Sequence, residues 1–177
     1  MHRKTAIRNL MVITGGFMLF PSCKNLPLKA SVSLKNFKIS ASQENLLAEI
    51  ASTIIPATDI GGAKEVEAHL FVLKMVDDLY EKEVQKDFIT GLNYLEADTL
   101  KRFDKSFADC SEDQKQKLLL DIESKKGYCK EVFDFFTIMK KSTIEGYLNS
   151  KYVMKNVIKY EFIPSHKYDG YYPVKNL

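Results

Sequence analysis

The sequence is short of the residues from which catalytic and metal sites are usually built. It has three cysteines and three histidines among 177 residues, too few for a zinc constellation. It contains no Gly-x-Ser-x-Gly turn, no Gly-x-Gly-x-x-Gly after a strand and no Cys-x-x-Cys-His for haem attachment. These absences argue against a nucleophile-elbow hydrolase, a dinucleotide-binding fold and a c-type cytochrome. We expect no catalytic, cofactor-binding or metal-binding residue in this chain.

The N-terminal apolar stretch is too short to span a membrane. Leu10–Phe20 is uncharged over 11 residues, whereas a spanning helix needs about 20. Because Arg3, Lys4 and Arg8 precede it, residues 1–22 are predicted to be a signal peptide. The basic run resembles a twin-arginine export signal with a lysine in the second position, and a general secretory signal is the alternative.

Cys23 follows this signal in a setting that resembles a lipobox. We expect it to carry diacylglycerol, since each buried CH₂ of an acyl chain contributes about 0.8 kcal/mol to membrane binding. The alternative is a cysteine that happens to follow an ordinary cleavage region. With the anchor, the protein is predicted to lie in the periplasm or cell envelope, attached to a membrane.

Without the signal peptide, the chain has no excess charge of either sign. Residues 1–22 hold three basic residues and no acidic one, so 26 Lys and Arg fall to 23, against 23 Asp and Glu. Nucleic-acid binders usually carry a basic surface. A nucleic-acid partner is therefore not expected.

The remaining cysteines and histidines give weak signals. Cys110 and Cys129 would close a loop of about 20 residues as a disulfide in an exported protein, and two free thiols are the alternative. His69 lies within a predicted helix, where a surface or half-buried position is the ordinary expectation. His166 lies in a turn-like run, and the pair Asp77-Asp78 is predicted to be solvated.

Hydrophobic periodicity predicts an all-α fold, an irregular bundle of about five helices with an extended C-terminal tail containing tyrosine and proline. Ser40 with Gln43, and Ser111 with Gln114, are capping boxes that start two of the helices. Residues 23–39 are predicted to be a tether, and residues 40–177 a single domain with its tail after Ser150. The helices are expected over residues 40–55, 64–80, 82–103, 111–126 and 128–148.

Three segments together resemble one protein family. Ile54–Ala63 is similar to an Ile-Ile-Pro-x-Thr-Asp-x-Pro-Gly-Ala hallmark, with Gly61 in place of the second proline. Thr143–Leu148 is similar to a Leu-x-Gly-Tyr-Phe segment, and Lys159–Gly170 to an Arg-Tyr-x-x-x-Pro-Gly-x-Tyr-x-Gly run. Their order and spacing, from Ser40 to Tyr172, resemble the small subunit (subunit 3) of the gluconate 2-dehydrogenase family.

The resemblance implies a non-catalytic subunit that supports export, maturation or stability of a large flavoprotein of the glucose-methanol-choline type. FAD would be bound by that partner and haem c by a cytochrome c subunit. A stand-alone lipid-anchored binding protein and an enzyme using His69 or His166 are the alternatives. The tail tyrosines could also cover the bundle. The expected partner surface comprises Pro56, Thr58, Asp59, Tyr160, Pro164, Tyr168, Gly170 and Tyr171.

Overall fold

The computed structural model describes residues 30–160, and within this range the chain forms a helical bundle without a β-sheet. The prediction of an all-α fold is confirmed. The α-helices are α2 (Ala41–Ile54), α3 (Ala68–Leu79), α4 (Lys82–Phe103), α5 (Glu112–Glu123) and α6 (Lys130–Leu148). A 3-10 turn, η2 (Phe107–Asp109), precedes α5, and a π-helical turn, η3 (Val153–Val157), follows α6.

Local capping sets the starts of α2 and α5. The side chains of Ser40 and Ser111 accept the backbone N–H of Gln43 and Gln114, and each glutamine side chain accepts the serine N–H in return. These reciprocal bonds satisfy donors that a helix start otherwise leaves free. Both predicted capping boxes are therefore confirmed.

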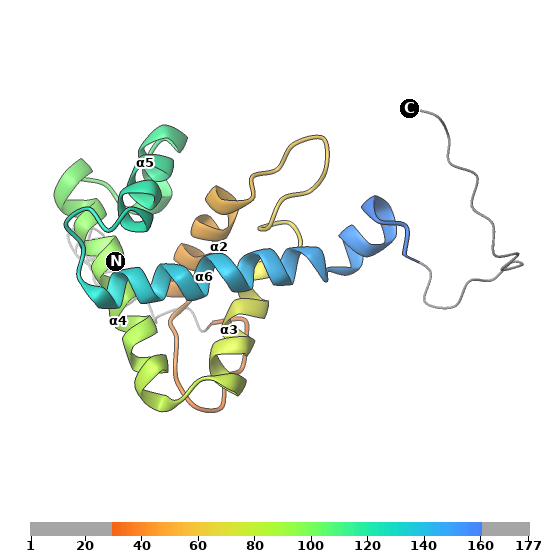
Figure 1. The fold of residues 1–177 in the computed structure, drawn as a ribbon, viewed down its shortest axis with the longest axis horizontal. Coiled ribbons are helices and arrows are strands. Elements are labelled where there is room, and N and C mark those ends of the chain that lie inside the picture. Colours follow the sequence, from red (N-terminus) through yellow and green to blue (C-terminus); the bar gives the residue numbers. More distant parts are fainter. Residues whose placement is uncertain (1–29, 161–177) are drawn as a thin grey trace, which may run out of the picture.

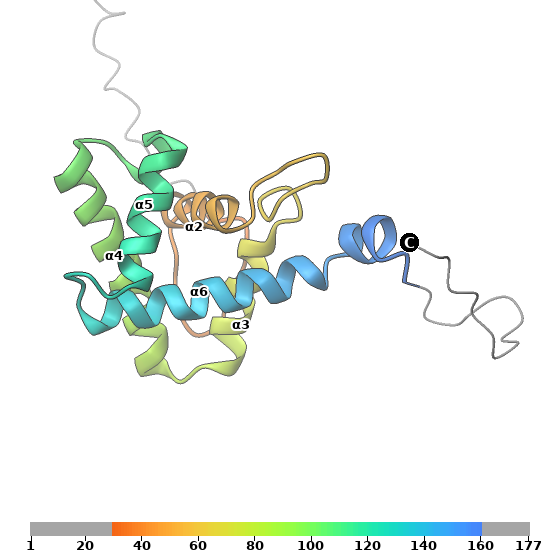
Figure 2. The ribbon, with the colours of Figure 1, turned by 45° about the horizontal axis from the view of Figure 1, so that its top comes forward.

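Helix α6 is the element around which the others pack. It contacts α2, α3, α4 and α5, and it crosses the middle of the molecule in both views (Figures 1 and 2). Phe135 and Met139 are fully buried on it, and the Phe135 ring lies 4.9 Å from that of Phe88 on α4. The Phe-rich segment is central to the bundle, as its broad apolar surface predicts.

Two glycines bring neighbouring helices close together. A Cβ on Gly91 of α4 would lie 2.5 Å from the Cβ of Phe135, and one on Gly146 of α6 would lie 2.8 Å from Phe71 on α3. A glycine inside a helix costs about 1 kcal/mol relative to alanine. Here that cost is offset by helix contacts that any larger side chain would block.

Helix ends differ from the sequence prediction. Helix α3 begins at Ala68, four residues later than expected, because Lys64–Glu67 form turns and Glu67 has a φ of 56°. Leu79 and Leu100, which follow the apolar spacing of α3 and α4, are 68% and 56% exposed. Both lie in the last turn of their helices, beyond the region that α6 covers.

The chain also stays helical for longer than predicted. Instead of an extended tail from residue 151, Lys151 and Tyr152 continue into η3, and Val153 is buried against the bundle. The end of α6 and η3 project beyond the other helices (Figures 1 and 2). Residues 161–177 lie outside the described range.

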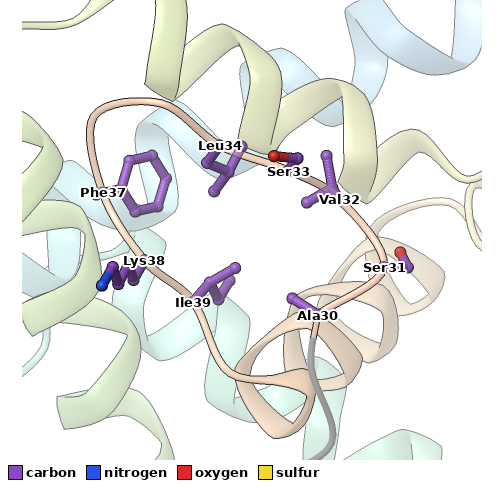
Figure 3. A pocket seen from close by; sticks show the side chains of 8 residues that line it. All are labelled: Ala30, Ser31, Val32, Ser33, Leu34, Phe37, Lys38 and Ile39. Atoms are coloured by element: carbon purple, nitrogen blue, oxygen red, sulfur yellow. The ribbon is translucent and has the colours of Figure 1, made fainter.

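Residues 30–39, predicted to belong to a free tether, pack on the bundle and are called the strap below. Their side chains alternate, with Val32, Leu34, Phe37 and Ile39 partly buried against the core. Figure 3 shows the strap curving around a hollow into which Leu34 and Ile39 point. The volume of this hollow is about 600 Å³. From residue 30 on, the expected tether is therefore part of the folded domain.

Asp77 holds the strap, which corrects its prediction as a solvated residue. Only 1% of Asp77 is exposed, and its carboxylate accepts the backbone N–H groups of Lys35 and Asn36, both at 2.8 Å. The Asn36 side chain also donates to the Asp77 carbonyl at 2.7 Å. Burial raises the pKa of Asp77, but the two backbone donors, with Lys74 and Lys35, outweigh it, so the pKa lies below its ordinary value.

The predicted disulfide is not formed in the structure. Cys110 is a buried free thiol before the N-cap of α5, and Cys129 is an exposed free thiol at the N-cap of α6. Eighteen residues lie between them, and 12 of these form α5, which is about 18 Å long.

We expect Asp77→Asn to lower stability at neutral pH by about 1–3 kcal/mol, because a buried donor loses its charged acceptor. Since the folded pKa of Asp77 is depressed, its contribution is present above the unfolded pKa and is lost as pH falls through the folded pKa. The thermal midpoint of the variant should therefore decrease less than that of wild type as the pH is lowered from neutral to acidic values. The control is Asp78→Asn, because Asp78 is the exposed neighbour of Asp77. Equal effects of the two substitutions would contradict the role of Asp77 in holding the strap.

Candidate functional site: a loop held against the end of α6

The loop Pro56–Ala63 stands out from the bundle beside the distal half of α6 (Figure 1). Its first five residues, Pro56–Ile60, are all exposed, whereas Gly62 and Ala63 are buried. Proline, threonine, aspartate and paired glycines favour this non-helical backbone. The loop therefore has an exposed outer arm and a buried base.

Backbone contacts close the base of the loop. The N–H of Ala63 donates to the carbonyl of Ile55 at 2.9 Å, and the N–H of Gly62 donates to the Glu65 carboxylate at 2.9 Å. A Cβ on Gly62 would lie 2.5 Å from the backbone nitrogen of Ala57. Only glycine fits where the two arms meet.

Two tyrosines, Tyr147 near the end of α6 and Tyr152 just before η3, hold Gly61 where the outer arm meets the base of the loop. The hydroxyl of Tyr147 donates to the carbonyl of Gly61 at 2.9 Å, and the N–H of Gly61 donates to the hydroxyl of Tyr152 at 3.2 Å. Tyr147 is only 9% exposed, and Gly146 before it allows the close approach of Phe71. Two of the three segments that carry the family resemblance therefore meet in space.

An ion-pair cluster lies where the chain leaves the loop. Glu49 of α2 pairs with Lys64, which follows the loop, and with Lys115 of α5 at 3.1 Å. Lys115 is 5% exposed and also pairs with Glu112 at 3.2 Å. Burial raises the pKa of Glu49, but the two lysines outweigh it and keep the carboxylate charged. Lys64 thus ties the end of the loop to α2, and Lys115 joins the same carboxylate to α5.

The predicted interface residues that the structure describes are all accessible. Pro56, Thr58 and Asp59 are exposed together on the outer arm, and Tyr160, after η3, is 54% exposed. The predictions for Cys23, Pro164, Tyr168, Gly170 and Tyr171 fall outside the described residues, as does His166.

Several exposed apolar residues near the loop were missed from the sequence. Ile60 is 42% exposed, and Ile144 and Leu148 on α6 are 38% and 49% exposed. Ile144 and Leu148 are each two residues from Gly146, so they point away from α3, which Gly146 faces. Their spacing of four residues, which places both on one side of the helix, was the available signal.

A shallow apolar groove of about 330 Å³ adjoins Pro56. Ile54, Leu119 and Phe136 contribute to its lining, and Leu120 at its edge is 63% exposed. The groove extends from Pro56, at the start of the outer arm, onto α5 and α6. Its charged lining residues, Glu123 and Lys140, form a salt bridge with each other.

His69, expected to be at the surface or half-buried, is buried on α3. It is 9% exposed, burial lowers its pKa, and its Nδ1 has no hydrogen-bond partner among residues 30–160. A neutral, enclosed imidazole is typical of packing between helices.

Among residues 30–160, no three His, Cys, Asp or Glu residues gather as metal ligands. No helix in this range is both long and apolar enough to cross a bilayer.

We expect Tyr147→Phe to loosen the loop without opening the core, because the ring remains while the bond to Gly61 is lost. The loss should be about 1 kcal/mol. Hydrogen exchange across residues 56–63 should become faster, while the exchange of α4 amides stays close to wild type. Tyr94→Phe is the control, since Tyr94 is 54% exposed. Unchanged exchange in the loop would contradict the role of Tyr147.

Comparison with known protein families identifies the family of this chain. Residues 41–164 match the family gluconate 2-dehydrogenase subunit 3. The matched range includes the helical bundle, the loop and the projecting end. Neither the curated proteins nor the solved structures give a significant match. Because the match extends over most of the sequence, this chain belongs to the gluconate 2-dehydrogenase subunit 3 family.

Proposed function

We propose that this chain is a non-catalytic accessory subunit of an exported, FAD-dependent sugar or sugar-acid dehydrogenase. Membership of a family named for a dehydrogenase subunit supports a role within a multi-subunit complex. The chain would bind the flavoprotein subunit and support its export, maturation or stability. FAD and haem c would belong to the flavoprotein and to a cytochrome c subunit.

The observation that carries this proposal is an exposed loop whose base is held rigidly. Pro56, Thr58 and Asp59 face solvent, while hydrogen bonds from Tyr147 and to Tyr152 fix Gly61 behind them. A surface already held in one conformation loses little entropy on binding, so more of its contact energy appears as affinity. A loop needed only to connect α2 and α3 would not require these long-range bonds.

The partner surface would combine polar and apolar contacts. Asp59 supplies a carboxylate, Pro56 a stiff apolar edge and Ile60 an exposed aliphatic side chain. Tyr160 is the second residue of the segment that resembles the C-terminal motif of the family, and tyrosine is favoured at interfaces because it buries a large area at low entropic cost. We propose that the loop and the segment from Tyr160 to Tyr172 bind the flavoprotein together.

We expect Asp59→Lys to weaken binding of the flavoprotein by roughly tenfold or more, because a charge reversed within an interface opposes the partner's complementary group. Capture of the chain from its native envelope should recover a flavoprotein with a flavin spectrum and haem c bands in wild type. The same capture should recover much less of both chromophores in the variant, while its thermal midpoint stays near wild type.

Matched substitutions separate a local effect from a general one. Asp87 is an exposed carboxylate on α4, and Asp87→Lys makes the same charge change away from the loop. Tyr160 and Tyr94 are both 54% exposed, so Tyr160→Ala should weaken capture and Tyr94→Ala should not. Wild-type complexes without flavin and haem, or equal losses in the controls, would contradict the proposed function.

We also propose that Cys23 anchors the subunit to a membrane. Cys23→Ala should move the protein from the membrane fraction to the soluble fraction when the membranes are washed at high salt, because the acyl chains supply hydrophobic attachment. Mass analysis of the native chain should find the corresponding added mass on Cys23. An unmodified cysteine and an unchanged distribution would exclude the anchor.

A further inference from the structure

The charges of this protein are segregated between its body and its projecting end. Residues 30–145 carry 16 Lys and Arg against 21 Asp and Glu, which is a net charge of −5. Residues 146–160, called the basic tip below, carry three lysines and no carboxylate, which is a net charge of +3. An acidic body therefore ends in a basic tip, although the chain after residue 22 is neutral as a whole.

The lysines of the basic tip stand among exposed apolar side chains. Lys151, Lys155 and Lys159 are all exposed, and no carboxylate in residues 30–160 forms a salt bridge with them. Val157 is 44% exposed and Ile158 is 52% exposed. The remaining exposed apolar residues of the tip are Leu148, Tyr152 and Tyr160.

The basic tip is folded before it meets any partner. Val153 is buried in the core, the N–H of Ile158 donates to its carbonyl at 2.9 Å, and the N–H of Tyr160 donates to the carbonyl of Met154 at 2.8 Å. The tip extends away from α2, α4 and α5 (Figures 1 and 2). On one side of the tip, Glu65 and Glu67 line a shallow pocket together with Lys151 and Lys155, so a flat surface would approach the tip from its other sides.

We propose that the basic tip docks on an anionic lipid surface. Lysine side chains can lie along apolar groups and place their ammonium groups among lipid phosphates, while Val157 and Ile158 enter the interface between headgroups and acyl chains. Tyr152, which is 37% exposed, suits the headgroup region. Repulsion of the acidic body by the same surface would orient the molecule with its tip toward the membrane. This contact is separate from acylation of Cys23 and does not depend on the flavoprotein.

Charge and apolar exposure together favour a lipid surface over an acidic protein groove. The three lysines occur at intervals of four residues, while the apolar residues lie between them over the whole tip. A bilayer accepts such a mixed surface without a fixed pattern of acceptors, because its headgroups and acyl chains rearrange around the protein. A contact of this kind weakens as salt screens the lysines.

The test measures co-sedimentation of the exported Cys23→Ala chain, which has no thiol at that position to acylate, with lipid vesicles. Vesicles of phosphatidylglycerol mixed with phosphatidylcholine should bind it at low salt, and pure phosphatidylcholine vesicles should not. Replacing Lys151, Lys155 and Lys159 with Gln should weaken binding roughly 100-fold, since each lysine near an anionic surface contributes a factor of about five. Replacing Val157 and Ile158 with Ser should also weaken it, with less change in its salt dependence.

The matched control replaces three other exposed lysines, Lys82, Lys86 and Lys117 on α4 and α5, with Gln. This variant has the same net charge as the tip variant and should bind vesicles like the parent. Circular dichroism should show that all variants are folded. Absence of binding to anionic vesicles, or equal losses in the two lysine variants, would overturn the proposal. It would also be overturned if the tip variant kept vesicle binding and lost only the flavoprotein, because the surface would then belong to a protein partner.

Discussion

The hydrogen bonds that join Gly61 to Tyr147 and Tyr152 connect the exposed part of this protein to its core. Gly61 lies between the arms of a loop, and each tyrosine lies more than 80 residues away in the sequence. Gly146 and Gly62 allow these bonds to form, because a larger side chain at either position would collide with Phe71 or with the loop itself. Residues of two segments that resemble the family therefore have structural roles. Together they hold the exposed outer arm of the loop in place.

Helix α6 links this loop to the rest of the molecule. Its first half packs Phe135 and Met139 into the core, its last turn carries Tyr147, and the chain then continues into the projecting η3. Displacement of α6 would therefore affect the core, the loop and the basic tip together. The proposed binding of a flavoprotein by the loop and of lipid by the tip would place both partners around one rigid helix.

Local signals in the sequence predicted much of the fold. The capping boxes at Ser40 and Ser111 and the apolar spacing of α4 depend on residues within a few positions, so they can be recognised without tertiary contacts. The prediction that Pro56, Thr58 and Asp59 form a partner surface came from the family resemblance, and all three are exposed. The burial of Asp77 could not be predicted, because it depends on N–H groups about 40 residues earlier in the chain. The contacts of Gly61 and the helical continuation to Val157 likewise depend on packing between distant segments.

The central claim is that the outer arm of the loop binds the flavoprotein. Hydrogen–deuterium exchange of the subunit alone and within the complex purified from its native envelope tests this most directly. The account predicts slower exchange on complex formation in the peptide covering residues 56–60, with little change in α5. Unchanged exchange in the loop, with protection confined to α4 or α5, would contradict the account and place the partner on another face.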